Sequence, residues 1–206
     1  MEEQKAQASF TAFAADRCLA TGPLVTVALA TRKYLLEEGQ HHVLVFDDRT
    51  GQQVDLDLRG SEDEVALRLQ PAVAVTPAPV IEPPASRGPG RPRLGVVARE
   101  VTLLPRHWEW LATQPGGASV TLRKLVDAAR REYAWQDAVR QAQVACDRFM
   151  MTMAGNRPGF EAASRALYAG DAAAFREHIA AWPVDIRAHA ARLALTAFEA
   201  QAPVAA

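Results

Sequence analysis

The sequence predicts an α+β fold: a small N-terminal β-β-α-β-β-α domain, a proline-rich linker, then a strand and a mostly helical C-terminal domain. Near the N-terminus, two alternating apolar runs flank turn-forming residues, which indicates β-hairpins. Seven of the thirteen prolines lie in residues 71–93 and interrupt any periodicity. Later apolar residues recur at helical spacing. The predicted segments are an α+β domain over 1–70, a linker over 71–93, a ribbon-helix-helix-like segment over 94–133 and a helical region over 134–206.

The first hairpin is expected in "SFTAFAADRCLATG", residues 9–22, with its turn near residues 15–17. The helix that follows is bounded by Pro23, at a plausible first helical position, and by Gly39. Both residues favour these positions because proline has a helical φ without an amide hydrogen and glycine tolerates the left-handed conformation. The order strand, strand, helix is therefore predicted for the first forty residues.

The second hairpin is expected in "VLVFDDRTGQQVDLDL", where the letters DRTG supply the turn. Every second residue from Val54 to Leu58 is apolar and the residues between are charged, so one face of this strand should be solvated. Ser61 and Glu64 have the spacing of a capping box, which predicts a short helix.

The C-terminal half is predicted to be a strand over residues 94–104 followed by helices. Pro105 should open the first helix, the letters PGG should end it, and Ser119 should cap the second. Further helices should end at Gly155 and Gly170, and Asp171 should cap the next. The apolar positions expected in the core are Phe149, Met150, Met153, Phe160, Ala163, Leu167, Phe175, Ile179, Ile186, Ala190, Leu193 and Leu195.

Charge is distributed unevenly along a chain whose formal net charge is −1. Residues 1–70 carry seven Lys and Arg against twelve Asp and Glu, whereas residues 87–131 carry nine Lys and Arg against three Asp and Glu. One segment therefore holds the positive excess that a polyanion partner requires. No apolar run approaches the roughly 20 residues that span a bilayer, and the N-terminus has no secretory signal, so we expect a cytoplasmic protein without membrane contact.

No catalytic, metal or cofactor site is predicted, and the chain is not expected to be an enzyme. Cys18 and Cys146 have no ligand-spaced companions and are expected to be free buried thiols. The paired aspartates of the second hairpin suggest acid and base chemistry, but a turn and a wet strand face favour solvated carboxylates. The histidines lack helical ligand spacing and are expected at the surface or at helix ends; P-loop, GxSxG and Rossmann motifs are absent.

The stretch "REVTLLPRHWEWLATQPGGASVTLRKLVDAARRE", within residues 98–133, resembles the ribbon-helix-helix module of bacterial repressors. In that family two chains pair their strands into a ribbon in the DNA major groove, and the N-terminus of the second helix holds a phosphate. The resemblance implies that Arg99, Val101 and Leu103 face the groove and that Ser119 lies at the phosphate. It places these residues in the shared core: Thr102, Leu104, Trp108, Leu111, Leu122, Leu125 and Val126.

The apolar Val101 and Leu103 depart from the family, which reads bases through polar or basic side chains. We therefore expect weak sequence discrimination. In an alternative register, Arg99 lies at the edge and the apolar face is buried against another part of the chain. Trp108 and Trp110 are about 200° apart on a helix, so at most one should be a core residue; the other is expected to pack on another domain or a dimer interface, or to stack on a base.

The letters "PGRPR", residues 89–93, are similar to the AT-hook, which lies extended in the minor groove of A·T-rich DNA. This resemblance implies that Arg91 and Arg93 enter or flank that groove. Pro89 replaces the first arginine of the motif, and Arg87 lies two residues earlier. A basic linker that serves only solubility is the alternative interpretation.

Four stretches together resemble a bacterial family classified only as a domain of unknown function. They include "FTAFAADRCLATGPL", "VLVFDDRTGQQVDLDLRG" and "RFMMTMAGNRPGFEAASRALYAGD", together with the basic stretch from Gly90 to Arg131. The resemblance spans nearly the full chain. It implies a bacterial cytosolic protein but does not imply any activity.

The leading hypothesis is a DNA-binding, regulatory homodimer with weak sequence discrimination. Its candidate DNA-binding residues are Arg87, Arg91, Arg93, Arg99, Arg106, Ser119, Arg123 and Lys124. Its candidate dimer or core residues are Val101, Leu103, Leu104, Trp108, Leu111, Leu122 and Leu125. The alternative is a non-enzymatic, homodimeric protein-interaction adaptor. The adaptor predicts that Val101 and Leu103 are buried, whereas the DNA-binding hypothesis predicts a solvent-facing two-stranded ribbon flanked by arginines.

Overall fold

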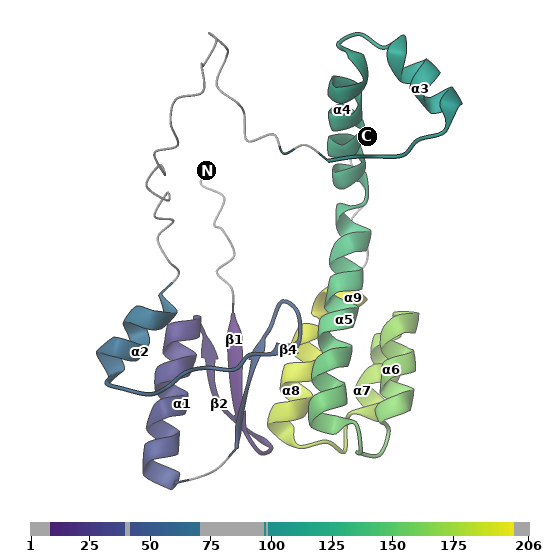
Figure 1. Ribbon diagram of the computed structural model, residues 1–206. Coiled ribbons are helices and arrows are strands. Elements are labelled where there is room, and N and C mark those ends of the chain that lie inside the picture. Colours follow the sequence, from purple (N-terminus) through teal and green to yellow (C-terminus); the bar gives the residue numbers. More distant parts are fainter. Residues whose placement is uncertain (1–8, 40–41, 71–96, 98, 200–206) are drawn as a thin grey trace, which may run out of the picture. The chain divides into compact units, whose positions relative to one another are not determined.

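The computed structural model describes residues 9–39, 42–70, 97 and 99–199. The chain forms two compact units: unit 1 comprises residues 1–71 and 134–206, and unit 2 comprises residues 72–133 (Figure 1). Unit 1 contains a sheet and most of the helices, and unit 2 contains two helices. The predicted proline-rich linker and the AT-hook-like letters lie outside the described residues. The prediction of a mixed α+β chain with a mostly helical C-terminal half is confirmed.

Four antiparallel strands form the sheet of unit 1 in the order β2-β1-β3-β4. The strands are β1 (Phe10–Ala14), β2 (Arg17–Gly22), β3 (Val43–Asp47) and β4 (Gln52–Gln53). The first hairpin closes as predicted through a tight turn in which Ala15 has a φ of 48°. β4 ends at Gln53, yet Val54, Leu56 and Leu58 are half-buried while their charged neighbours are exposed. The predicted solvent-exposed face of residues 54–58 is therefore present, although β4 itself is only two residues long.

Helices α1 (Leu24–Glu38) and α2 (Glu62–Leu69) follow the two hairpins. Pro23 is the N-cap of α1, one position earlier than predicted, and Gly39 ends the helix with a φ of 79°. The predicted capping box of α2 is confirmed, since the Glu64 amide donates to Ser61 Oγ at 3.2 Å and the Ser61 amide donates to Glu64 Oε2 at 2.7 Å.

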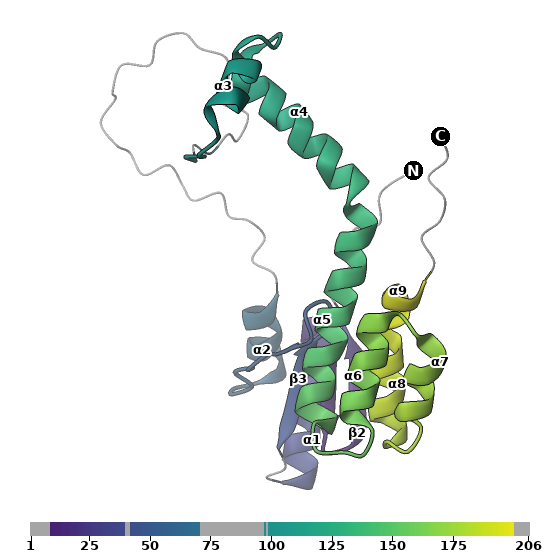
Figure 2. The same cartoon turned by 90° about the vertical axis from the view of Figure 1, so that its right-hand side faces the viewer.

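The sheet lies between α1 on one face and the C-terminal helices on the other (Figures 1 and 2). Alternation along the strands produces the two faces. Ala12 and Val45 pack with Val27 of α1, whereas Phe13 and Phe46 belong to the larger core formed with the C-terminal helices. The sheet is therefore apolar on both faces, and each face has its own helical cover.

Five helices complete unit 1: α5 (Ala134–Ala154), α6 (Phe160–Ala169), α7 (Ala172–His178), α8 (Val184–Leu193) and α9 (Leu195–Phe198). The predicted boundary between α6 and α7 is confirmed. Gly170 adopts the left-handed conformation that ends α6, and the Asp171 carboxylate accepts the amides of Ala173 and Ala174, each at 3.0 Å.

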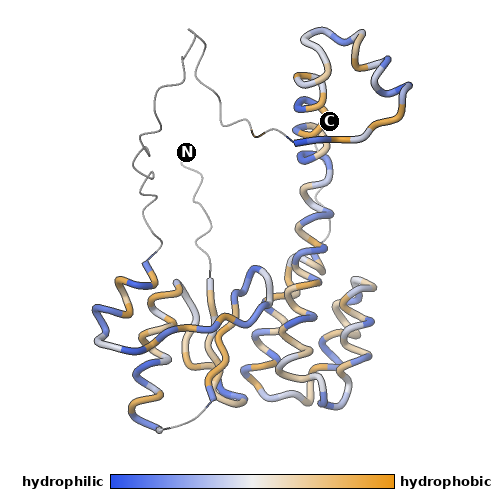
Figure 3. The backbone as a smooth tube through the Cα atoms, in the orientation of Figure 1, coloured by the Kyte–Doolittle hydropathy of each residue, from blue (hydrophilic) through white to orange (hydrophobic). Residues whose placement is uncertain are grey.

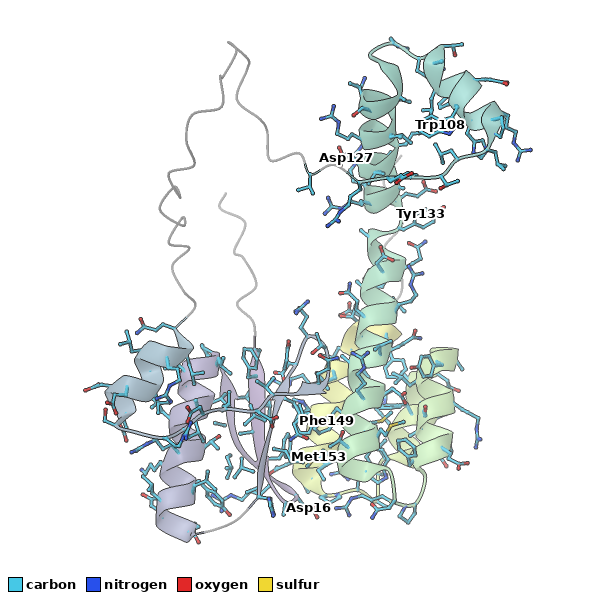
Figure 4. All side chains as sticks on the ribbon, in the orientation of Figure 1. Asp16, Trp108, Asp127, Tyr133, Phe149 and Met153 are labelled. Atoms are coloured by element: carbon cyan, nitrogen blue, oxygen red, sulfur yellow. The ribbon has the colours of Figure 1, made fainter. Side chains whose placement is uncertain are left out.

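Side chains from both ends of the chain form the main core of unit 1. Phe149 projects from α5 (Figure 4). Its ring lies 5.4 Å from that of Phe13 and 5.1 Å from that of Phe46, measured between centroids. The N-terminal α+β segment and the C-terminal helices, which the sequence presents as separate segments, thus contribute to one core. Burial of these aromatic rings is the largest apolar contribution to this unit.

Most of the predicted core positions on the C-terminal helices are buried. Phe149, Met150, Ala163, Leu167, Phe175, Ile179, Ile186 and Ala190 are fully enclosed, and Met153, Phe160 and Leu193 pack partly against them. The prediction for Leu195 is wrong: it is 59% exposed because α9 is a single short turn with its core side at Ala197. Cys146 is a free buried thiol, as predicted, and burial raises its pKa, so it stays protonated. Cys18 is free and half-buried.

Unit 2 contains α3 (Pro105–Ala112) and α4 (Gly117–Glu132). Pro105 opens α3 as predicted. The predicted strand over 94–104 is not observed, since residue 97 and residues 99–104 belong to no strand. A strand requires a paired neighbour, and the described part of unit 2 offers none. Ser119 does not cap α4; Gly116, with a φ of 90°, is the N-cap and Ser119 lies in the first turn.

Gly51, in the turn between β3 and β4, is expected to be the least replaceable glycine of unit 1. Its φ is 66°, and a Cβ there would lie 2.0 Å from the Ala145 carbonyl oxygen of α5. Alanine at this position would combine backbone strain at a positive φ with overlap between its Cβ and the Ala145 carbonyl. Gly51→Ala should therefore lower the free energy of unfolding by about 3 kcal/mol or more. Urea denaturation of the purified chain measures the change.

Gly39→Ala is the matched control, since its φ is 79° but no atom lies within 4 Å of the added Cβ. It should cost only about 1 kcal/mol, the backbone strain alone. Equal losses for the two variants would show that the turn does not pack closely on α5.

Candidate functional site

Unit 2 is a helical hairpin with very little interior of its own. Of its described residues, 97 and 99–133, only Leu111 is buried, at 2% exposure. It lies in a hollow of about 280 Å³ that is also lined by Leu103, His107, Trp110, Leu122 and Leu125. The turn between α3 and α4 is made by Gly116 and Gly117, whose φ values of 90° and 74° favour glycine. The hairpin is therefore tightly turned but thinly packed.

Large apolar side chains are exposed over the whole hairpin. Trp108 is 43% exposed, Trp110 is 49% exposed and Val126 is 56% exposed. Val97, Val101, Leu104, Leu125 and Tyr133 are also exposed, and α4 contains no buried residue. Of the predicted dimer or core residues, Leu111 is buried, Leu103 and Leu122 are half-buried, and Val101, Leu104, Trp108 and Leu125 are exposed. An exposed apolar surface of this kind is typical of an interface.

The two sides of α4 differ in character, as the alternating colours along the helix show (Figure 3). An α-helix turns by about 100° per residue, so its apolar residues gather on one side. We call this side the apolar face; it comprises Leu122, Leu125, Val126, Ala129 and, just after the helix, Tyr133. The opposite side, which we call the basic face, comprises Arg123, Lys124, Arg130 and Arg131, with Asp127 among them. All five residues of the basic face are exposed.

The predicted DNA-binding residues fall into three groups in the structure. Arg123 and Lys124 belong to the basic face, and Arg123 Nε donates to the Ser119 carbonyl at 3.1 Å. Arg99 and Arg106 are exposed, in the segment before α3 and in its first turn. Arg87, Arg91 and Arg93 lie outside the described residues. Arg130 and Arg131, which the sequence did not single out, also belong to the basic face, since their spacing of seven from Arg123 and Lys124 places them on the same side of the helix.

The feature expected to separate DNA binding from protein interaction gives a mixed result. Val101 is 56% exposed, as the DNA-binding hypothesis predicts, but residues 99–104 do not form a strand. Leu103 is half-buried against the hairpin. The exposed basic and apolar faces of α4 therefore become the main structural features of unit 2.

A second site, which the sequence did not reveal, lies between the sheet and α8 in unit 1. Arg192 Nη2 donates to Asp48 Oδ2 at 3.0 Å and to Thr11 Oγ1 at 2.9 Å, and Thr11 Oγ1 donates to Asp48 Oδ2 at 3.1 Å. The side chain of Asp48 is 11% exposed and that of His189 is 4% exposed. We call Thr11, Asp48, His189 and Arg192 the buried polar cluster.

The environment of His189 selects its neutral form. Arg192 Nη2 lies 2.8 Å from Nδ1 of His189 and shares its two hydrogens among Nδ1, Asp48 Oδ2 and Thr11 Oγ1; because a guanidinium only donates, Nδ1 is the acceptor in this contact. Nε2 faces Asp48 Oδ1 at 3.4 Å. The pKa of His189 is lowered to about 4: burial lowers it most, the Asp48 charge opposes this effect, and the Arg192 charge also lowers it. Nε2 of His189 and Oδ1 of Asp48 are both buried and make no hydrogen bond, so His189 is held by its contact with Arg192 and by its packing in the core.

Two expectations about these residues are wrong. Asp48 lies in a turn as expected, but its carboxylate is nearly buried instead of solvated, and the side-chain bond to the turn backbone is made by Asp47, whose Oδ1 accepts the Arg49 amide at 2.8 Å. His189 was expected at the surface or at a helix end, but it packs edge-on against the ring of Phe13 at 5.4 Å. The spacing of His189 and Arg192, three residues apart on one helix, is the only sequence signal of this cluster.

Within the described chain, no group of three or more His, Cys, Asp or Glu side chains is arranged to hold a metal ion. The helices described here include none with the length and apolar character needed to cross a membrane.

Residues 9–194 match the model of a family described as "Uncharacterized protein conserved in bacteria (DUF2239)". This match confirms the resemblance to an uncharacterised bacterial family and extends from β1 to the end of α8. No curated protein and no solved structure matches the chain. The resemblances to a ribbon-helix-helix module and to an AT-hook stay predictions.

Acid should weaken unit 1 through His189. Its pKa is about 4 in the folded chain and about 6.5 when unfolded, so between these values the unfolded state binds more protons and stability falls as the pH falls. The loss at pH 4 should be on the order of 3 kcal/mol. Urea denaturation from pH 7 to pH 4 measures it.

The His189→Gln variant should be less stable at pH 7 but should show a flatter dependence on pH. His42→Gln, which changes an exposed histidine of the same unit, is the control and should retain the full dependence. If the slope between pH 6.5 and pH 4 is the same in the wild type and in His189→Gln, the assigned role of His189 is wrong.

Proposed function

Since the chain belongs to DUF2239, a bacterial family described as uncharacterised, we propose its function from its own residues: a DNA-binding regulatory protein that acts as a homodimer through unit 2. The observation that carries the proposal is the division of α4 into an apolar face and a basic face. One helix can then bind a second copy with one side and a polyanion with the other.

The apolar face supports dimerisation. The described part of unit 2, residues 97 and 99–133, encloses a single side chain, which supplies little apolar burial to stabilise the hairpin without a partner. Pairing two hairpins would bury Leu125, Val126 and Tyr133, each now about half exposed. An apolar residue buried in this way contributes roughly 1.5–3 kcal/mol.

The basic face supports binding to the phosphate backbone. Its four cationic side chains extend over more than two turns of α4, and two copies would present eight. Contacts of this kind supply affinity and orientation but carry little sequence information. Arg99 and Arg106 are exposed and available to extend the same surface. Weak sequence discrimination is therefore part of the proposal. Arg87, Arg91 and Arg93 of the linker would add further contacts to the phosphate backbone.

A non-enzymatic, homodimeric protein-interaction adaptor is the second candidate, and the exposed indoles of Trp108 and Trp110 favour it. Tryptophan is enriched at the centres of protein interfaces. In this alternative the apolar surface of the hairpin binds another protein and the basic face serves solubility.

Duplex binding tests the first candidate. Fluorescence anisotropy of the full chain with short A·T-rich and G·C-rich duplexes should show binding to both that weakens steeply with salt. Arg130→Gln/Arg131→Gln removes two cations from the basic face, so the log–log salt slope should become shallower by about 1.8. The Arg91→Ala/Arg93→Ala variant measures the contribution of the linker to duplex affinity.

Lys33→Gln/Arg165→Gln is the matched control, because it makes the same change in net charge at exposed positions of α1 and α6. Its salt slope should equal that of the wild type. Absence of binding to either duplex at low salt would overturn the DNA-binding proposal and leave the adaptor.

Sedimentation equilibrium of the full chain tests the dimer. Leu125→Glu places a charge on the apolar face and should weaken self-association by at least about tenfold, since burying an unpaired carboxylate costs more than the roughly 1.4 kcal/mol that this factor represents. Ala128→Glu adds the same charge at an exposed position beside that face and should leave association nearly unchanged. A wild type that stays monomeric at high concentration would refute the proposed dimer.

A further inference from the structure

A hollow in unit 1 gathers cationic side chains that none of the preceding roles uses. It has a volume of about 370 Å³ and lies between the β3–β4 turn and α5. We call it the arginine hollow; it is lined by Arg49, Thr50, Asp137, Arg140, Gln141, Val144 and Arg148. We propose that it is a binding site for a small phosphorylated molecule.

Helical spacing on α5 accounts for one wall. Asp137, Gln141, Val144 and Arg148 follow one another at separations of four, three and four, and Arg140 is four residues before Val144, so the five residues lie in one stripe along the helix. The β3–β4 turn supplies the opposite wall, with Arg49 and Thr50. Residues almost a hundred positions apart in the sequence are thus brought to one surface of the same unit.

The turn is docked on α5, which fixes the geometry of the hollow. Gly51 is buried against the Ala145 carbonyl, and a Cβ there would lie 2.0 Å from its oxygen. Arg148 Nη1 donates to the Thr50 carbonyl at 3.2 Å, and the Gly51 amide donates to the Asp47 carbonyl at 2.8 Å. Preorganisation of this kind lowers the entropy cost of binding.

The charges around the hollow are unbalanced toward the positive. Arg140 pairs with Asp137, and Arg49 lies 3.7 Å from Asp47, but Arg148 has no ion-pair partner among the described residues. Three guanidinium groups therefore share the hollow with one lining carboxylate. The planar donor fork of arginine matches phosphate oxygens, and a phosphate monoester carries between −1.5 and −2 charges at neutral pH. The excess charge favours this ligand over a monocarboxylate.

A second hollow of about 380 Å³ adjoins the first, and Arg49 and Gln141 line both. Its other lining residues include Ala138, Ala142, Leu193 and Thr196, together with Asp48 and Arg192 of the buried polar cluster. Ligand sites commonly have volumes of roughly 300–1,000 Å³. The combined space suits a molecule with a phosphate group at the arginine hollow and a compact organic body beside it, such as a nucleoside diphosphate.

Isothermal titration calorimetry of the full chain with inorganic pyrophosphate, ADP and citrate tests the proposal at low ionic strength. Pyrophosphate should bind saturably with a dissociation constant below about 1 mM. ADP should bind more tightly than pyrophosphate because its nucleoside fills the second hollow. Citrate, an anion without phosphate, should bind more weakly than either.

Arg148→Gln should weaken pyrophosphate binding about tenfold or more, the factor expected for one lost charge-assisted contact. Arg165→Gln, an exposed arginine of α6, makes the same change in charge and should bind as the wild type does. Equal losses in the two variants, absence of saturable binding, or citrate binding as tight as that of pyrophosphate would overturn the proposal.

The same variants separate this site from the duplex surface. If Arg148→Gln lowered duplex affinity but left pyrophosphate binding unchanged, the hollow would be a polyanion contact and the small-molecule assignment would be wrong. The proposal does not depend on DNA binding by α4, because every residue that carries it belongs to unit 1.

Discussion

Burial of one face of the sheet by the C-terminal helices is the constraint on which unit 1 depends. Phe13 and Phe46 project from β1 and β3 onto Phe149 of α5, and the three rings meet at distances typical of attractive aromatic pairs. A four-stranded sheet with only α1 on one face would leave these rings in water. The first seventy residues therefore need the last seventy, and the chain leaves the unit after residue 71 and returns to it at residue 134.

Polar contacts then fix the orientation of the C-terminal helices that the apolar core packs against the sheet. The Cys18 amide donates to Asp185 Oδ2 at 2.8 Å, and Arg157 pairs with Asp16, so the tip of the first hairpin is fixed to the helical layer at two points. The buried polar cluster does the same at the other end of the strands, where Arg192 joins Asp48, Thr11 and His189. Such contacts add modest net energy, but a buried group that loses its partner is costly. They therefore select one orientation of the helices on the sheet.

The two units differ in how completely they bury their own apolar side chains, and this difference is relevant to function. Unit 1 encloses the rings of Phe13, Phe46, Phe149 and Phe175 and leaves charged hollows at its surface, where we propose that a small ligand binds. The hairpin of unit 2 encloses a single leucine and leaves two tryptophans partly exposed, which suits association with another macromolecule. The two proposals therefore concern different units: a small ligand at unit 1 and a macromolecular partner at unit 2.

Local rules in the sequence determined the elements of this protein. Turn and cap residues such as Ser61, Pro105 and Asp171 act on their immediate neighbours, and helical periodicity depends only on positions a few residues away, so the helices, the first hairpin and most core positions could be predicted. The sequence also predicted the basic segment, residues 87–131, and the amphipathic helix within it. The tertiary structure alone decided which elements share a core, because the contacts of Phe13 with Phe149 join residues whose proximity no local pattern encodes. For the same reason it alone brought Asp48 to His189 and Arg49 to Arg148. The expected strand is not formed by residue 97 or residues 99–104, because no described residue pairs with them.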